Sequence, residues 1–465
     1  MNDGCFLFVT GVPHNYFKRF EHGKIEWKYK KRTCLTGGVW MDQWYRIDNT
    51  GKIFHAVSDA TNSSVFRVSM ILNEKVDPKY LQEALDIVAV RFPALTVRVR
   101  KGLFWDFMEH NDAQLIVKPE KEHPCTPIDR KENNAYLIRV LYFERRISVE
   151  IFHSLTDGGG AVEFLKTLIF QYLKEKGEAV ETEGLVLSPE DTPKPEEVED
   201  SFEKHATSHA VTRPGKRPGK AYQIQGTSFE PPGINVIHGV MDAGRLNAFS
   251  KSRGTTVTGF LTSVLIEVVH DERMTKDLTD GQVSIALPVS LRKQFPSTTL
   301  RNFFSVANIG VQMDGYMHLE DIIADVTGQL IKKTDQDTLQ TGINRFVSLQ
   351  KSLWIRGVPV FIKYPLMKFG FNQIGERAKT MTLSNLGNTK LPESMKPYVD
   401  RMEVILYPTR KSPINCGLGT VNDKLTITFA RSIEEREIIQ AFFRRLRKIT
   451  GLDITVYSNE WGENE

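Results

Sequence analysis

A histidine and an aspartate separated by three residues follow a short apolar strand, in the order His153-Ser-Leu-Thr-Asp157. In the strand Ile147–Phe152 the apolar residues alternate, and the same alternation puts His153 on the apolar face at its end. Burial disfavours an imidazolium, so such a histidine stays neutral and can accept a proton near pH 7. Three glycines, 158–160, let other backbone come close to it. This is the chemistry of a general base that acts on a hydroxyl, amine or thiol.

Three other interpretations fit the same residues. A single histidine on an apolar face is often a packed residue bonded to a carbonyl group. His153 and Asp157 also match two ligands of a metal, although no His-rich or Cys-rich cluster supplies an obvious third. The glycine triplet after a strand resembles a phosphate-binding loop, but it lacks the Lys-Ser/Thr ending and the glycine spacing of that motif.

Two segments in the second half of the chain carry more polar residues than packing requires. Arg292 follows the apolar run Val283–Val289 closely, where its guanidinium is well placed to hold a carboxylate with two hydrogen bonds. The segment Thr382–Gly387 ends in Ser384, Asn385 and a glycine, whose groups can orient a carbonyl or donate to an oxyanion. Each segment alone is also ordinary turn chemistry.

Taken in chain order, these segments resemble the superfamily of CoA-dependent acyltransferases with an HxxxD motif. That superfamily includes chloramphenicol acetyltransferase, condensation domains, plant BAHD enzymes and wax ester synthases. The resemblance runs from about Met41 to Thr450 and is strongest to bacterial alcohol acetyltransferases. It rests further on Tyr45–Asn49, on 291–297 (LRKQFPS) and on 383–387 (LSNLG). The chain lacks the Asp-Phe-Gly-Trp-Gly motif of the plant branch.

The resemblance implies an α+β fold of two chloramphenicol-acetyltransferase-like sandwich domains, each a mixed sheet backed by helices, with an active-site tunnel between them. It implies acyl transfer from acyl-CoA, a co-substrate, to a small alcohol or amine, with no metal and no tightly bound cofactor. A carrier-protein donor, as in condensation domains, and a non-catalytic relative that binds a ligand in the same place are the alternatives.

The resemblance also implies a role for each matched residue. His153 is the general base, while Asp157 is a structural residue that pairs with Arg292. Gly158 lets the backbone pass the tunnel, and it contributes to substrate binding together with Ser384, Asn385 and Asn302. Ser384 and Asn385 are expected to face His153 from the other domain. Asn302 stands where relatives carry a Gly-Asn pair, but Arg301 precedes it here, which puts its role in question.

Hydrophobic periodicity and composition predict the domain organisation. Residues 41–180 form a first domain, 181–232 a linker or surface crossover, and 233–465 a second domain. Helices are expected at 78–91, 161–176, 257–269, 322–332 and 433–450. Strands are expected at 64–72, 96–100, 103–108, 136–143, 147–152, 235–241, 283–289, 305–313, 381–386, 402–407 and 425–429. The basic stretch Arg213–Lys220 in the crossover is interpreted as a solvated loop rather than a phosphate contact.

Composition narrows the class of protein. The 465 residues are 40% hydrophobic and 25% charged, as in ordinary globular proteins. The net charge of +4 comes from residues 1–40, so the rest of the chain is balanced and nucleic-acid binding is not expected. Four widely spaced cysteines favour a reducing cytoplasm over a disulfide framework.

Residues 1–40 differ from the rest, because they show no sustained helical or strand period. They are interpreted as a basic leader that is disordered or lies upstream of a true start at Met41, with a genuine basic arm as the alternative. The apolar segment Trp354–Gly370 contains Pro359 and Pro365, which favours a broken, buried crossover on the sheet. Its alternative is a weak membrane-surface contact that admits a lipid-like alcohol.

Overall fold

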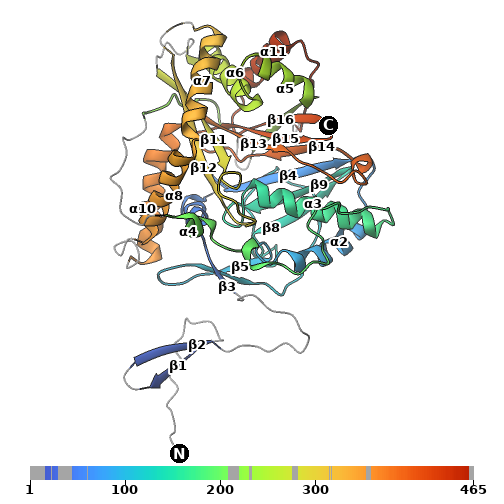
Figure 1. The fold of residues 1–465 in the computed structure, drawn as a ribbon, viewed down its shortest axis with the longest axis vertical. Helices are drawn as coiled ribbons and strands as arrows, with labels where there is room; N and C mark the ends of the chain where they lie inside the picture. The colour runs from blue at the N-terminus through green and yellow to red at the C-terminus, as the bar shows by residue number, and fades with distance from the viewer. Residues whose placement is uncertain are drawn as a thin grey trace, which may run out of the picture.

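The computed structural model describes residues 16–21, 24–29, 44–59, 61–207, 219–229, 233–274, 281–313, 315, 317–351 and 358–459 (Figure 1). Two sheets with their own helices lie one above the other in this view, and the chain passes from the lower to the upper one. The strands β1 (Tyr16–Glu21) and β2 (Lys24–Tyr29) pair with each other in a region where the sequence predicted no regular element. The basic stretch 213–220 lies outside the described residues except for Gly219 and Lys220.

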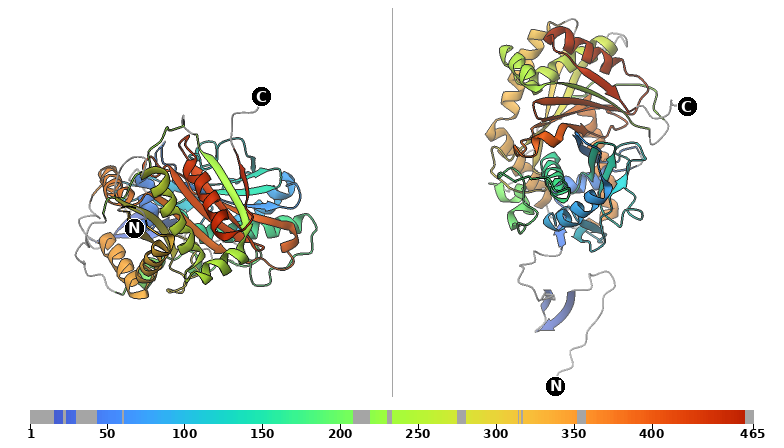
Figure 2. Two further views of the ribbon diagram at one scale, coloured as in Figure 1. Left: turned by 90° about the horizontal axis from the view of Figure 1, so that it is seen from above. Right: turned by 90° about the vertical axis from the view of Figure 1, so that its right-hand side faces the viewer.

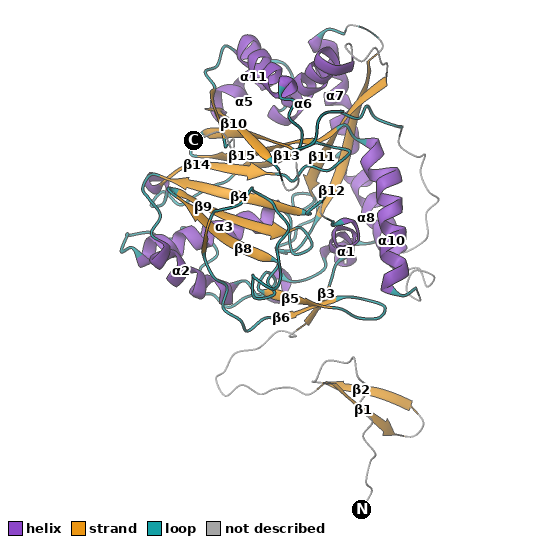
Figure 3. Cartoon of the chain, turned by 180° about the vertical axis from the view of Figure 1, so that it is seen from behind, coloured by secondary structure: helices purple, strands orange, loops and turns teal. Residues whose placement is uncertain are grey.

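The first sheet has five strands in the order β14-β4-β9-β8-β7. Its strand β4 is buried along its whole length because the sheet is covered on both faces. The helices α2 and α3 cover one face and pack on each other (Figure 3). A small sheet, β3-β6-β5, lies nearby. The bounds of these elements are β4 (Val65–Leu72), α2 (Pro78–Arg91), β7 (Lys118–Pro119), β8 (Ile138–Phe143), β9 (Arg146–Phe152), α3 (Gly158–Glu175), β14 (Val399–Ile405), β3 (Trp44–Arg46), β5 (Val97–Arg100) and β6 (Phe107–His110).

The second sheet has seven strands in the order β12-β11-β13-β15-β16-β10-β17. The helices α6, α7 and α11 lie over one face and share a hydrophobic core with it (Figure 2). Its elements are β10 (Asn235–Asp242), α5 (Ala243–Ser252), α6 (Val257–Val269), β11 (Gly281–Ser290), β12 (Phe304–Met313), α7 (Leu319–Lys333), β13 (Met381–Asn388), β15 (Ile414–Val421), β16 (Lys424–Arg431), α11 (Glu437–Thr450) and β17 (Thr455–Ser458).

Strand β14 joins the two bodies. It follows β13 in the chain, leaves the second sheet to pair antiparallel with β4 of the first, and lies against β15 and β16. The approach is close, because a Cβ atom on Gly417 would be 2.3 Å from the carbonyl oxygen of Val404. The two sheets therefore do not divide the chain at a single position, and the first one is completed by residues from near the C-terminus.

The loop 291–303 between β11 and β12 has a hydrophobic core of its own. Leu291 and Phe303, at its two ends, are fully buried, and Phe295 packs with them against α8 (Gln336–Lys351) and α4 (Ser201–His205). The crossover is therefore not only a linker, since its helix α4 helps to anchor this loop. Arg292 and Asn302 stand at the two ends of the loop, opposite each other.

The segment that ends at Gly370 is a helix, α10 (Val360–Gly370), which packs on α1 (Asn49–Val57). Pro359 is the residue before its first turn, where a missing N–H costs nothing, and Pro365 lies within it. Phe361, Leu366 and Phe369 are 63–70% exposed, so the predicted buried path is wrong for this helix. None of the helices in the described residues has both the length and the apolar character needed to span a membrane.

Candidate active site

His153 lies just past the end of β9, where the two bodies meet. Its backbone N–H donates to the carbonyl oxygen of Ser64, beside the start of β4, at 2.8 Å. The imidazole stacks on Phe54 of α1 with 4.2 Å between ring centroids and 15° between planes. Phe66 lies at 4.7 Å on a tilted plane. The ring is thus held by aromatic packing from α1 and β4.

Burial lowers the pKa of His153 below its usual value of 6.5. The negative charge of Asp157 and hydrogen bonds to Asn302 and to backbone act in the opposite direction but do not overcome burial. The ring is therefore neutral at pH 7 and able to accept a proton.

Asn302 fixes which ring nitrogen accepts that proton. Its amide nitrogen faces two acceptors, the carbonyl oxygen of His153 at 3.1 Å and Oδ2 of Asp48 at 3.4 Å. Its amide oxygen therefore faces Nδ1 of His153, at 3.2 Å. Because an amide oxygen can only accept, Nδ1 carries the ring proton and Nε2 keeps its lone pair.

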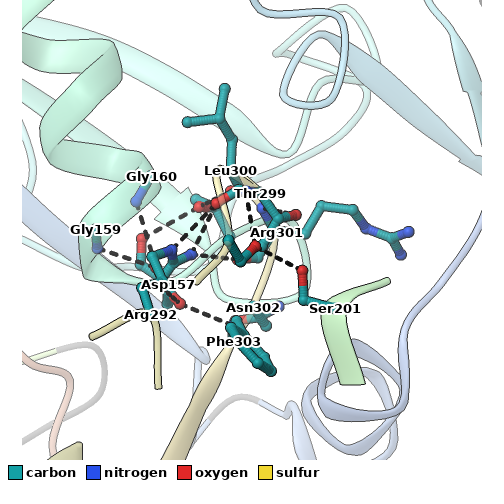
Figure 4. A network of polar contacts seen from close by, with 12 residues as sticks. Asp157, Gly159, Gly160, Ser201, Arg292, Thr299, Leu300, Arg301, Asn302 and Phe303 are labelled. Atoms are coloured by element: carbon teal, nitrogen blue, oxygen red, sulfur yellow. Dashed lines mark hydrogen bonds and ion pairs between the residues drawn. The ribbon is translucent and has the colours of Figure 1, made fainter. Parts of the chain in front are cut away.

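Asp157 does not contact the imidazole and instead begins helix α3. Its Oδ1 accepts the N–H groups of Gly159 and Gly160 as an N-cap, at 3.0 and 3.3 Å. Its Oδ2 accepts Nη1 of Arg292 at 2.8 Å and the N–H of Phe303 at 2.9 Å (Figure 4). The predicted ion pair is present. With four N–H donors the carboxylate is saturated, which argues against its use as a metal ligand.

Arg292 links Asp157 to the loop that carries Asn302. Its guanidinium donates to the carbonyl oxygens of Thr299, at 3.0 and 3.2 Å, and of Arg301, at 2.7 Å (Figure 4). A chain of polar contacts thus runs from Asp157 through Arg292 and the loop backbone to Asn302 and Nδ1 of His153. These residues position the base rather than take protons themselves.

Two glycines of the triplet lie in close contact with residues of the second body. A Cβ atom on Gly158 would be 2.4 Å from Cδ2 of Leu386, which places β13 directly against the start of α3. A Cβ atom on Gly160 would be 2.2 Å from Oγ1 of Thr156 and 2.4 Å from the carbonyl oxygen of Leu300. The triplet therefore permits the two bodies to approach, instead of forming a phosphate loop.

Ser384 and Asn385 lie in β13 next to Leu386. The side chain of Asn385 is used within its own body, where it donates to Oγ1 of Thr258 at 2.9 Å and accepts the N–H of Gly387 at 2.8 Å. Ser384 is buried. In the described part of the chain, no hydrogen bond joins either residue to His153, so their substrate contacts remain a prediction.

Two polar residues of the site had no role in the sequence prediction. Asp48 caps α1, bonds Asn302, and has its pKa raised to about 6, chiefly by burial. Arg301 turns away from His153, to the carbonyl oxygens of Arg46 and Val198 and to within 3.6 Å of Asp48. In the sequence, Asp48 belongs to the segment Tyr45–Asn49, which contributes to the family resemblance.

No family model and no curated protein sequence matches this chain. Solved structures do. Polyketide synthase associated protein 5 from Mycobacterium tuberculosis aligns with a TM-score of 0.58 and 13% identity, over 87% of this chain and 98% of that chain. The trichothecene 15-O-acetyltransferase from Fusarium sporotrichioides gives 0.54 and 11%, over 88% and 94%. The starter condensation domain of rhizomide synthetase, solved with C8-CoA and Leu-SNAC, gives 0.52 and 11%, over 88% and 94%.

The chain has the two-domain fold of these proteins. The predicted fold class, two bodies that each combine a sheet with helices, is confirmed. At this level of identity the likeness concerns the fold, and the activity has to be argued from the site.

Proposed function

We propose that this protein is an acyltransferase that moves an acyl group from acyl-CoA to an alcohol or amine acceptor, with His153 as general base. The observation that carries the proposal is the state of the imidazole. It is neutral because of burial, its Nδ1 proton is held by Asn302, and its Nε2 is left to accept a proton. The structural neighbours, which include an acetyltransferase and a condensation domain, support acyl transfer.

In the proposed reaction, Nε2 of His153 takes the proton of the acceptor hydroxyl or amine as its oxygen or nitrogen attacks the thioester carbonyl. The tetrahedral oxyanion then collapses, the carbon–sulfur bond breaks, and the CoA thiolate leaves with the proton from the imidazolium. The ester or amide and free CoA are the products, and no covalent enzyme intermediate is needed. Proton transfer to Nε2 requires the tautomer that carries its proton on Nδ1, and Asn302 stabilises that tautomer before the substrate binds.

A carrier protein is the alternative donor, since condensation domains share the fold. Both donors present the acyl group as a thioester of phosphopantetheine, so the proposed role of His153 is the same for each. The donor can be identified by comparing acyl-CoA with acylated carrier protein under the same conditions.

The test is thiol release from a panel of acyl-CoAs in the presence of alcohols and amines. We expect His153→Ala to lower kcat/KM by about 10² to 10⁴, the usual contribution of a general base. His110→Ala is the matched control, because His110 is an exposed histidine on β6 and should not affect the rate. Equal thiol release by wild type and His153→Ala would refute the proposal.

A further inference from the structure

A polar cavity of about 650 Å³ opens near the end of α1. Its walls come from four parts of the chain, residues 57–62, 220–225, 368–377 and 409–411. The volume is in the range of small-ligand sites and far exceeds that of one phosphate ion. The cavity is separate from the contacts that hold His153.

Five of the fourteen residues that line this cavity are cationic, and two are acidic. Two of its five cations, Lys368 and Lys411, have partners within the protein, Asp59 at 2.6 Å and the carbonyl oxygen of Asn372 at 2.9 Å. The other three are exposed and form no ion pair with any described residue: Lys220, Arg377 and Arg410.

The lining holds two carboxylates, Asp59 and Glu376, against its five cations, which leaves a surplus of three positive charges. Glu376 also forms an ion pair with Lys379 at 2.9 Å and accepts the hydroxyl of Thr409 at 2.5 Å. Two of the exposed cations are arginines, whose guanidinium groups are suited to phosphate oxygens.

The cavity is connected to His153 through a short path of backbone contacts. Asn62 lines the cavity, and its Oδ1 accepts the backbone N–H and the hydroxyl of Ser64, both at 3.2 Å. The carbonyl oxygen of Ser64 in turn accepts the N–H of His153. The wall of the cavity at Asn62 therefore lies close to the residues that support the backbone of His153.

We propose that this cavity binds the phosphate-bearing end of a substrate of the transfer reaction. The inference rests on the proposed function, and it names the site that recognises the substrate. Two sources share the chemistry, the nucleotide phosphates of the acyl-CoA donor and the phosphate of a phosphorylated acceptor. In CoA the nucleotide phosphates and the reacting thioester lie at opposite ends of the pantetheine arm, so the donor is the first source to test.

The test uses the double variant Arg377→Gln/Arg410→Gln, which removes two exposed cations that form no ion pair with any described residue. Calorimetric titration measures binding of CoA, adenosine 3′,5′-bisphosphate and inorganic pyrophosphate. We expect the Kd of CoA and of the bisphosphate to rise by at least about tenfold, with the KM of an acyl-pantetheine that lacks the nucleotide unchanged. The matched control is Arg145→Gln/Arg444→Gln, which loses the same charge at exposed positions elsewhere.

The outcomes separate the two sources. If CoA binding is unchanged but pyrophosphate binding weakens, the cavity takes a phosphate and the acceptor is its source. If no anion binds more weakly to the double variant than to the control, the inference is wrong. Because binding is measured without turnover, a protein that binds CoA here but releases no thiol keeps this site and loses the proposed function instead.

Discussion

Replacing Asp157 by asparagine tests the chain of contacts that positions the base. The substitution keeps the shape of the side chain but removes its charge and turns one acceptor into a donor. Since both carboxylate oxygens accept two N–H groups, the new NH₂ must face donors in either orientation. Removing one partner of a buried ion pair costs about 3–5 kcal/mol. Arg292 is 20% exposed, so we expect about 3 kcal/mol, at the lower end of that range.

The same change should slow the reaction. Without the carboxylate of Asp157, Arg292 no longer holds the loop firmly through the carbonyl oxygens of Thr299 and Arg301. Asn302, which this loop carries, and the His153 ring that it contacts then become less well positioned. A displacement of about 1 Å in a catalytic group can cost roughly a hundredfold in rate, so we expect kcat to fall by about 10- to 100-fold. Urea unfolding and thiol release measure the two effects.

Two companion variants make the result decisive. Asp77→Asn is the control, since Asp77 caps α2 but forms no ion pair with any arginine in the described part of the chain, and asparagine is an equally good N-cap. In the double variant Asp157→Asn/Arg292→Met the uncompensated charge is gone, so its stability should be close to that of Asp157→Asn alone. Additive losses, or an Asp157→Asn protein as stable and as active as wild type, would show that the ion pair does not position the base.

Three further outcomes are expected. Gly160→Ala should lower the free energy of unfolding by about 1–3 kcal/mol in urea titration, because the added Cβ atom collides with the carbonyl oxygen of Leu300. Its control, Gly328→Ala, places the new Cβ atom in open space within α7 and should raise the free energy of unfolding by about 0.5–1 kcal/mol. The acid limb of the kcat/KM profile should have its midpoint below pH 6.5, because burial lowers the pKa of His153, and a midpoint above pH 6.5 would contradict that lowering. For the same reason, the free energy of unfolding should decrease as the pH falls below 6.5. Arg67→Met should lower the free energy of unfolding by about 3–5 kcal/mol in the same titration, because Arg67 is buried between Glu120 and Glu150, at 2.6 and 2.7 Å. A loss of less than about 1 kcal/mol would be inconsistent with two buried ion pairs.

The helices and strands with clear local sequence signals, such as an N-cap or a regular apolar stripe, were predicted from the sequence. The helix Pro78–Arg91 has the predicted bounds, because Asp77 and Pro78 mark its start and its apolar stripe is regular. Helix α1 was not predicted, since it is short and its fixed position comes from packing on α10 and on the histidine ring. The two prolines of 354–370 pointed to a broken path, yet one precedes the helix and the other is accommodated within it.

Contacts between residues far apart in the chain could not be predicted from the sequence pattern alone. Asp157 and Arg292 are 135 residues apart, and only the family resemblance suggested that they pair. The role of Asn302 was in question because of Arg301. In the structure Asn302 contacts Nδ1 of His153, whereas Arg301 donates to the carbonyl oxygen of Arg46, and both side chains lie near Asp48. The cationic cavity could not be assembled from the sequence, because four separate segments meet to form it. Only Lys220 belongs to the basic stretch 213–220, which was interpreted as a solvated loop.

The crossing strand β14 has a consequence for how the protein is made. It pairs with β4, from which it is separated by more than 320 residues of sequence. At about 5–20 residues per second, the ribosome delivers β14 roughly 20–60 s after β4 has been synthesised. During that interval the nascent first sheet has an unpaired edge of apolar residues, which is a template for aggregation. A truncated chain that ends in the crossover would keep this edge permanently, so we expect the first domain expressed alone to be insoluble.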